Sequence, residues 1–475
     1  MMERAREHGL LTLLFALSRA GLWAAGLPFS YRFDWLFFAD PADLHERLGD
    51  TLVHFHLYPP GMNLCAGALF AAGGGQNAAR FVYAVMGGVL VNALYYLLRA
   101  LGIPALAGLL VTLAFASIPS TVYFESSFTD TFPAAALGTL AAALLHRAVV
   151  RPSSATWTGF FATLALLSLV RSSFHLAWFV LLLGGAVALV PHEARRLVCK
   201  AALGPLLLVA LLYAKNLVLF DFFGPGSHAG FAYHALTNRV LSDEKAAFVR
   251  EQRISRLAAL PVYAPPSAFE PYFPPPSWSP SPLLSSFERP TVDEPNFNHV
   301  FLLDAARIHR SDARRAVFAR PLSYAREALE TLGRFFGPST RYHPRDASPA
   351  GPHHGHRQVL GAFENAFDTL VHAFPRGPAG LYLLLPLPLA WAVGRARRLL
   401  RERPSERAEA MVLAFCVTQV VYLTAISALS LSTEVARYRY ASEPLVWLLV
   451  ALAVRMVLAN RARRRRAEDL AGHLR

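Results

Sequence analysis

The segment FVYAVMGGVLVNALYYLLRA, residues 81–100, is apolar along almost its whole length and carries one charge, Arg99, near its end. A helix needs about 20 predominantly apolar residues to cross the hydrocarbon core of a bilayer. Similar runs recur along the 475-residue chain, of which 54% is hydrophobic and 16% charged. This composition excludes an ordinary soluble protein and predicts an all-α, polytopic membrane protein.

The apolar runs predict about ten transmembrane helices, within a range of roughly 10 to 12. Arg19 interrupts the first run and no small-residue cleavage site follows it, so we expect a retained helix and not a cleaved signal peptide. The predicted spans are residues 10–29, 81–100, 103–120, 130–149, 155–171, 174–191, 199–220, 378–394, 408–430 and 440–458.

The net charge of +14 is explained by topology and not by nucleic acid, which we exclude as a partner. If the N-terminus is cytoplasmic and the spans alternate, every strongly basic loop lies on the cytoplasmic side, as the positive-inside rule requires. Both termini are then cytoplasmic, and we expect a bacterial inner (plasma) membrane. The basic loops contain Arg99, His146, Arg147, Arg151, Arg195, Arg196, Lys200, residues 394–407 and residues 460–466.

One short apolar segment, Met62–Ala72, does not fit the series of spans. Its eleven residues cover only about 16 Å as a helix. We expect it to lie on the outer face, because a crossing here would invert every later loop.

The spans divide the chain into three parts. Residues 1–220 form an N-terminal transmembrane module with a first outer loop, 30–80. Residues 221–377 form a large extracytoplasmic region, and 378–475 form C-terminal helices with a basic cytoplasmic tail. Ten prolines between Pro261 and Pro290 are expected to block helix and to favour extended chain.

Four cations violate the charge rule, because they lie at the outer ends of predicted spans. Charged groups at membrane depth are costly and usually face a cavity or a partner. Arginine and lysine here suit a phosphate-bearing lipid head group, although each one singly is also explained by snorkelling or by pairing with Glu434 or Glu443. The four cations are Arg171, Lys215, Arg437 and Arg439.

The first outer loop, FSYRFDWLFFADPADLHERLGD, places carboxylates directly after the first span. Asp34, Asp40 and Asp43 lie in it. A carboxylate just outside the membrane is suited to act as general base on an acceptor hydroxyl. The alternative is an ordinary loop in which Asp40-Pro41 and Asp43 form a turn and a helix cap.

Several patches, taken in order, resemble the GT-C fold glycosyltransferases, and glycosyltransferase family 39 in particular. That family includes protein O-mannosyltransferases and bacterial aminoarabinose transferases. The patches that follow the acidic first loop are HLYPPGMNL, ARFVYAVMGGVLVNALYYLLRALG, YFESSFTDTFPAAALG, LVRSSF, AKNLVLFDFFGPGSHAG, RPLSYAREALETLGRFFGP and EVARYRYASEPLVWLL.

The resemblance implies an inverting transfer of a single sugar on the extracytoplasmic side. The donor is polyprenyl-phosphate-linked, and the acceptor is a lipid, a glycan or a protein. Asp34 matches the catalytic base, with Asp40 as second choice; the chain has Asp34-Trp35 where the family often has an acidic pair. The positions implied to bind substrate are His56, Glu125, Asp130, Arg171, Lys215, Asn216, Arg437 and Arg439.

No cofactor is implied, and the transfer is metal-independent or only weakly linked to a divalent metal. The three cysteines, Cys65, Cys199 and Cys416, lack metal-ligand spacing. The histidine-rich stretch 343–357 is predicted to be a flexible outer loop in preference to a metal site.

Two other functions stay open. A lipid or anion transporter or flippase would use the same cations, but the inverted halves typical of many transporters are not visible. An O-antigen ligase or polymerase would share the large outer loop and the outward arginines, but would not need a base just after the first span.

Overall fold

The computed structural model of the chain describes residues 2–274, 281–336, 385–430 and 435–473. These residues are mostly helical, and their one sheet pairs two two-residue strands, β1 (Glu288–Arg289) and β2 (Glu294–Pro295). The predicted all-α class is therefore confirmed. The elongated part of the molecule contains α1 (Met2–Ala24), α5 (Gln76–Ala100), α6 (Ala105–Ser117), α7 (Pro119–Glu125), α8 (Thr131–Val150), α9 (Ser154–Val170), α10 (Leu176–Leu189), α11 (His192–Phe220), α17 (Pro386–Glu402), α18 (Arg407–Leu429) and α20 (Glu443–His473).

Among the described residues, five helices are long and apolar enough to cross a membrane: α5, α8, α11, α18 and the Glu443–Arg463 part of α20. The pair α6 and α7 makes a sixth if it counts as one bent span. The helices α9 and α10 are apolar but have only 17 and 14 residues. Each predicted span overlaps one of these helices, α1 or α17. However, the predicted span 103–120 is broken at Ile118 into α6 and α7, and five or six of the described helices meet the length and apolarity of a span, against ten predicted. Residues 378–384 lie outside the described residues. The chain is an integral, multi-pass membrane protein.

The bend between α6 and α7 has a local cause. Pro119 is the first residue of α7, and Ile118 before it is extended. Proline disfavours helical backbone at the preceding residue, so α6 ends at Ser117 and the two axes meet at 63°. The bend directs α7 toward the segment that precedes α8.

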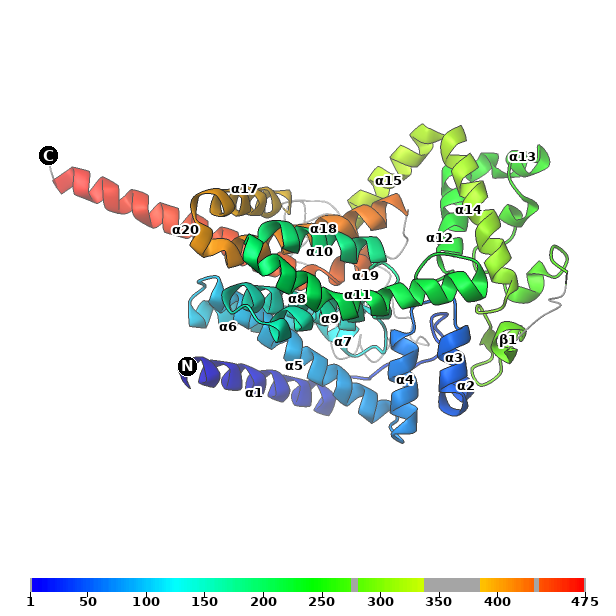
Figure 1. Ribbon diagram of the computed structural model, residues 1–475, viewed down its shortest axis with the longest axis horizontal. Coiled ribbons are helices and arrows are strands. Elements are labelled where there is room, and N and C mark those ends of the chain that lie inside the picture. The colour runs from blue at the N-terminus through cyan, green and yellow to red at the C-terminus, as the bar shows by residue number, and fades with distance from the viewer. Residues whose placement is uncertain (1, 275–280, 337–384, 431–434, 474–475) are drawn as a thin grey trace.

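The two chain ends lie at the same end of the molecule, on the left in Figure 1. The opposite end carries the short helices of the first outer loop and the helices that follow α11 (Figure 1). This arrangement is the one that an even number of crossings produces. At the end with the termini, Arg99 pairs with Glu7 of α1 at 3.0 Å.

The first outer loop contains α2 (Pro41–Glu46), α3 (Leu48–His54) and α4 (Gly61–Ala71), which run across the direction of α1 and α5 in Figure 1. Helix α4 covers the short segment that was expected not to cross. Its first residue, Gly61, sits on the end of α9, where an added Cβ would lie 2.6 Å from the carbonyl oxygen of Leu169. Only glycine permits this close approach.

The region after α11 is compact. Its helices are α12 (Ala229–Leu241), α13 (Lys245–Arg250), α14 (Phe301–Ala319) and α15 (Pro321–Phe336), and the short helix α19 (Val435–Tyr440) lies beside α15 and α18. Large side chains of this region, such as Phe269 and Phe297, belong to the same apolar core as Phe33 and Phe55 of the first outer loop. The two outer segments therefore fold together.

The prediction of extended chain in the proline-rich stretch was wrong in part. Its described residues contain no α-helix, as expected, but they form the 3₁₀ turns η3 (Pro266–Phe269) and η4 (Pro282–Leu284), after η2 (Arg256–Ala259). Proline occupies the start of η3 and η4, because its fixed φ suits a first helical position as well as an extended one. The histidine-rich stretch 343–357 and Glu434 lie outside the described residues.

Candidate active site

A cavity of about 200 Å³ lies where the helix bundle meets the two outer segments. The first outer loop supplies Trp35, Leu36, Phe37 and Tyr58, and the region around α12 supplies a second wall. The start of the first loop is fixed beside α8, because the Ser30 carbonyl accepts from the Phe128 N–H at 2.9 Å. The remaining lining residues are Asp130, Arg171, Ser172, Ser173, His228, Phe231, Ala232, Ala235, Tyr263, Ser430, Arg437 and Tyr438.

The cavity contains a buried charge cluster. Arg437 donates to the carboxylate of Asp130 and, through Nε, to Oγ1 of Thr131 at 2.9 Å. Arg171 Nη1 lies 3.4 Å from the same carboxylate oxygen of Asp130 and 3.2 Å from Thr131 Oγ1. All of these side chains are buried. Three of the residues predicted to bind substrate, Asp130, Arg171 and Arg437, therefore meet at one point.

Local structure explains this meeting. Asp130 is the residue before α8, and Arg171 is the residue after α9, so the antiparallel packing of α8 against α9 brings them together. A carboxylate at a helix N-terminus and a cation at a helix C-terminus are both favoured by the helix dipole. Helix α19 then adds Arg437 from the C-terminal part of the chain.

Among the described residues, the cluster brings the two guanidinium groups of Arg171 and Arg437 to the single carboxylate of Asp130. The guanidinium carbon of Arg437 lies 5.8 Å from the ring centroids of Trp35 and Phe37, and that of Arg171 lies 5.0 Å from the ring of Tyr438. Aromatic faces favour such cations. The cavity is thus suited to an anionic group next to a flat or apolar one.

The two candidate bases lie in the loop that forms one wall, but neither lines the cavity. Asp34 precedes Trp35, and its side chain, 29% exposed, pairs with Arg32. Asp40 is buried and caps α2, where it accepts from Ala42 N at 2.9 Å. It also accepts from the N–H of Thr291 at 2.9 Å and its hydroxyl at 2.6 Å. Asp40 has the helix-capping contact that was the alternative interpretation.

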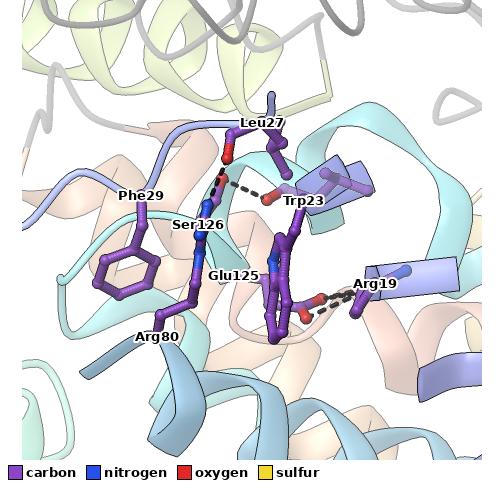
Figure 2. A pocket seen from close by; sticks show the side chains of 8 residues that line it. Arg19, Trp23, Leu27, Phe29, Arg80, Glu125 and Ser126 are labelled. Carbon is purple, nitrogen blue, oxygen red and sulfur yellow. Dashed lines mark hydrogen bonds and ion pairs between the residues drawn. The ribbon is translucent and has the colours of Figure 1, made fainter. Parts of the chain in front are cut away.

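Glu125 lies away from the cavity, in a buried ion pair with Arg19 of α1 (Figure 2). Arg19 Nε donates to both carboxylate oxygens at 2.9 Å, and its Nη2 also donates to the Ala116 carbonyl at 2.8 Å. The space beside this pair holds only about 10 Å³. Arg19, the partner of Glu125, is the charged residue that interrupts the first apolar run of the sequence.

Three other predicted binding residues donate to backbone carbonyl groups outside the cavity. Lys215 donates to the Phe55 carbonyl at 2.8 Å, and Asn216 donates to the Gly224 carbonyl at 2.7 Å. Arg439 Nη1 donates to the Phe335 carbonyl at 3.1 Å. None of the three is among the residues that line the cavity.

His56 is buried between the first outer loop and the segment after α11. Its Nδ1 lies 2.8 Å from the Ser227 hydroxyl, and its backbone N–H donates to the side-chain oxygen of Asn298 at 2.8 Å. Burial, and then the charge of Lys215, lower the pKa of His56 to about 3. The imidazole is neutral at physiological pH, and His56 is not among the described residues that line the cavity.

Across the described residues, no group of three histidine, cysteine, aspartate or glutamate side chains is placed to hold a metal ion. The aromatic wall, with Trp35, Phe37, Tyr58, His228 and Tyr438, was missed by sequence reasoning. The aromatic residues of the predicted outer loops were the feature of the sequence that could have indicated this wall.

No protein-family model and no curated protein matches this chain. Among solved structures, it is similar to the crystal structure of the Archaeoglobus fulgidus oligosaccharyltransferase in complex with zinc and sulfate, with a TM-score of 0.41 and 14% sequence identity. The match covers 94% of this chain and 49% of that chain, so this chain spans about half the length of the archaeal protein. A likeness at this level assigns neither a family nor an activity to the chain.

Proposed function

We propose that the protein is a membrane glycosyltransferase that transfers a single sugar from a polyprenyl-phosphate donor to an acceptor lipid, glycan or protein. The observation that carries the proposal is the pair of buried guanidinium groups, Arg171 and Arg437, which share one carboxylate in a cavity with an aromatic wall. The resemblance of the sequence patches to glycosyltransferase family 39 points to the same chemistry. We place the reaction on the extracytoplasmic side of a bacterial inner membrane, with both termini cytoplasmic.

In this reaction the acceptor hydroxyl oxygen attacks the anomeric carbon while the bond from that carbon to the phosphate oxygen breaks. The hydroxyl proton passes to a carboxylate base, and the polyprenyl phosphate leaves with the electron pair. Attack opposite to the leaving group inverts the anomeric carbon. Two guanidinium groups in a site shielded from water stabilise the negative charge that develops on the phosphate.

Aromatic rings support the role of the cavity as a sugar site. Trp35 and Phe37 face Arg437, so a sugar next to the phosphate would lie against them. Asp34 remains the first choice for the base because it adjoins Trp35 in the same loop, while the carboxylate of Asp40 is occupied by three hydrogen bonds. Asp34 reaches the acceptor only if the loop presents its side chain to the cavity mouth.

Mass spectrometry of glycans and glycolipids from a deletion strain tests the proposal. We expect the loss of one sugar from a specific glycan, lipid or protein, its restoration by the wild-type gene, and no restoration by an Arg171→Ala/Arg437→Ala double variant. In nanodiscs that also contain an acceptor, the purified protein should release polyprenyl phosphate from a polyprenyl-phosphate sugar as the sugar passes to the acceptor hydroxyl, and it should leave nucleotide sugars intact. An unchanged sugar profile, together with movement of the lipid across the bilayer without sugar loss, would instead identify a flippase.

A further inference from the structure

Arg289, in strand β1, is bound by the backbone of the first outer loop. Its side chain is 3% exposed. Nη1 donates to the carbonyl oxygens of Phe33 at 2.9 Å, Trp35 at 3.2 Å and Phe38 at 3.0 Å, and Nη2 donates to that of Asp34 at 3.0 Å. One guanidinium group therefore gathers four carbonyl groups from six consecutive residues.

These contacts determine the conformation of a stretch that has no regular structure of its own. Residues 31–40 contain no helix and no strand, so their backbone groups lack the partners that secondary structure provides. Buried carbonyl groups without partners are destabilising. The planar, fixed geometry of a guanidinium lets it serve several acceptors at once, whereas a lysine ammonium is a compact point charge.

A second contact joins the same two segments, and again the β1–β2 turn donates and the first outer loop accepts. The carboxylate of Asp40, in the first outer loop, accepts from the N–H and the hydroxyl of Thr291 at 2.9 and 2.6 Å. Thr291 follows Arg289 closely, in the connection between β1 and β2. The β1–β2 turn and the first outer loop thus hold each other at two points.

The stretch held by Arg289 is also one wall of the cavity. Trp35, Leu36 and Phe37 line it, and the rings of Trp35 and Phe37 face the guanidinium of Arg437. Asp34, the proposed base, lies between two of the residues whose carbonyls Arg289 binds.

We propose that Arg289 is a positioning residue: it holds residues 33–38 so that the aromatic wall of Trp35 and Phe37 is placed against the Asp130, Arg171 and Arg437 cluster. The functional part of this inference rests on the proposed glycosyltransferase activity. The structural part, that Arg289 sets the conformation of the loop, stands without it.

The test compares Arg289→Lys with Arg326→Lys, which changes an exposed arginine of α15 that lies outside the site. Leu36→Cys is introduced into a chain in which Cys65, Cys199 and Cys416 are replaced by alanine, and its labelling by a water-soluble maleimide is measured in nanodiscs. We expect faster labelling with Arg289→Lys and the original rate with Arg326→Lys. Equal rates in both would overturn the inference, whether or not the protein transfers sugar.

Activity then tests the link to catalysis. A misplacement of about 1 Å in a catalytic loop reduces turnover by roughly 100-fold, so kcat should fall by about 10- to 100-fold in Arg289→Lys. The Trp35→Phe change should add little to that loss, because residues that act as a unit show non-additive effects. Fully additive losses would mean that Arg289 acts independently of the wall.

Thr291→Val provides a milder variant in case Arg289→Lys does not fold. It removes the hydroxyl that donates to Asp40 and keeps the backbone N–H contact. It should raise the labelling of Leu36→Cys by a smaller factor than Arg289→Lys. An unchanged labelling rate in this variant would also count against the two-point attachment.

Discussion

Arg437 and Asp130 form a buried ion pair that connects the short helix α19, which precedes α20, to the beginning of α8. Both side chains lie in the wall of the cavity, and Arg171 approaches the same carboxylate. The pair thus joins two distant parts of the chain at the position where the proposed donor phosphate would bind.

Replacement of Arg437 by alanine should impair donor use. Removing one charge-stabilising group from a site shielded from water costs about 10²- to 10³-fold in kcat. We expect a loss of this size in steady-state kinetics with a polyprenyl-phosphate sugar. Arg307→Ala, which removes an exposed arginine paired with Asp304, is the matched control. Unchanged donor KM and kcat in Arg437→Ala would argue against a phosphate role.

Asp34→Asn should abolish sugar transfer and leave folding and membrane insertion intact. Loss of a general base typically costs about 10²- to 10⁴-fold, and the exposed pair with Arg32 contributes little to stability. Transfer kinetics and a thermal unfolding curve give the two readouts. Asp43→Asn, which breaks the neighbouring pair with Arg47, should be fully active. If Asp34→Asn retains full activity, the base lies elsewhere.

The Arg19–Glu125 ion pair lies outside the cavity, so we expect its disruption to lower the stability of the protein. Glu125→Gln leaves the Arg19 charge buried without compensation, which should destabilise the protein by about 3–5 kcal/mol. The double variant Arg19→Met/Glu125→Leu should recover most of this loss, because neither charge remains. Thermal unfolding in detergent measures all three proteins. A Glu125→Gln protein as stable as wild type would contradict the uncompensated-charge argument.

His56 predicts how stability depends on pH. In the folded protein its pKa is lowered to about 3, whereas in the unfolded chain the pKa is about 6.5. The unfolded state therefore binds a proton first as the pH falls, so the stability contributed by neutral His56 is complete above pH 6.5 and declines below it. Between pH 8 and pH 5 the loss should be about 2 kcal/mol.

Unfolding curves of His56→Gln measure this contribution, because the variant should lose that part of the pH dependence. His45→Gln, which removes an exposed histidine of α2, is the matched control. A His56→Gln slope equal to that of the wild type would show that the imidazole titrates alike in both states.

Reporter fusions test the topology. A reporter after Ala72 should report the extracytoplasmic side, because α4 lies at the end of the molecule opposite both termini (Figure 1). A reporter after Arg151, in the connection between α8 and α9, should report the cytoplasm. The same side for both fusions would contradict the alternation of spans.

Much of the fold follows from properties that neighbouring residues share. The length of an apolar run, the proline that ends α6 and the cap that Asp40 provides for α2 all act within a few residues. The concentration of arginines in short loops likewise indicates which connections lie together. The apolar runs and the basic loops were predicted from the sequence, and the Asp40 cap was the alternative interpretation of the first outer loop. The break at Pro119 falls inside the predicted span 103–120 and was not predicted.

The pairing of charges was decided by tertiary structure. Glu125 and Asp130 lie close together in the sequence, yet Glu125 meets Arg19 and Asp130 meets Arg171 and Arg437. The bend of α7 and the start of α8 turn the two carboxylates toward different helices. No spacing rule within the segment indicates which distant cation each carboxylate will reach.

By itself, the sequence determined a polytopic helical membrane protein with unusual cations at one end, because hydrophobic length and loop charge are local quantities. Only the tertiary structure decided that Arg171 and Arg437 share Asp130, that the wall beside them is aromatic, and that Arg289 holds that wall. The physical reason is that such contacts depend on how helices and loops from distant parts of the chain pack, and each is stabilised only once that packing has removed it from water.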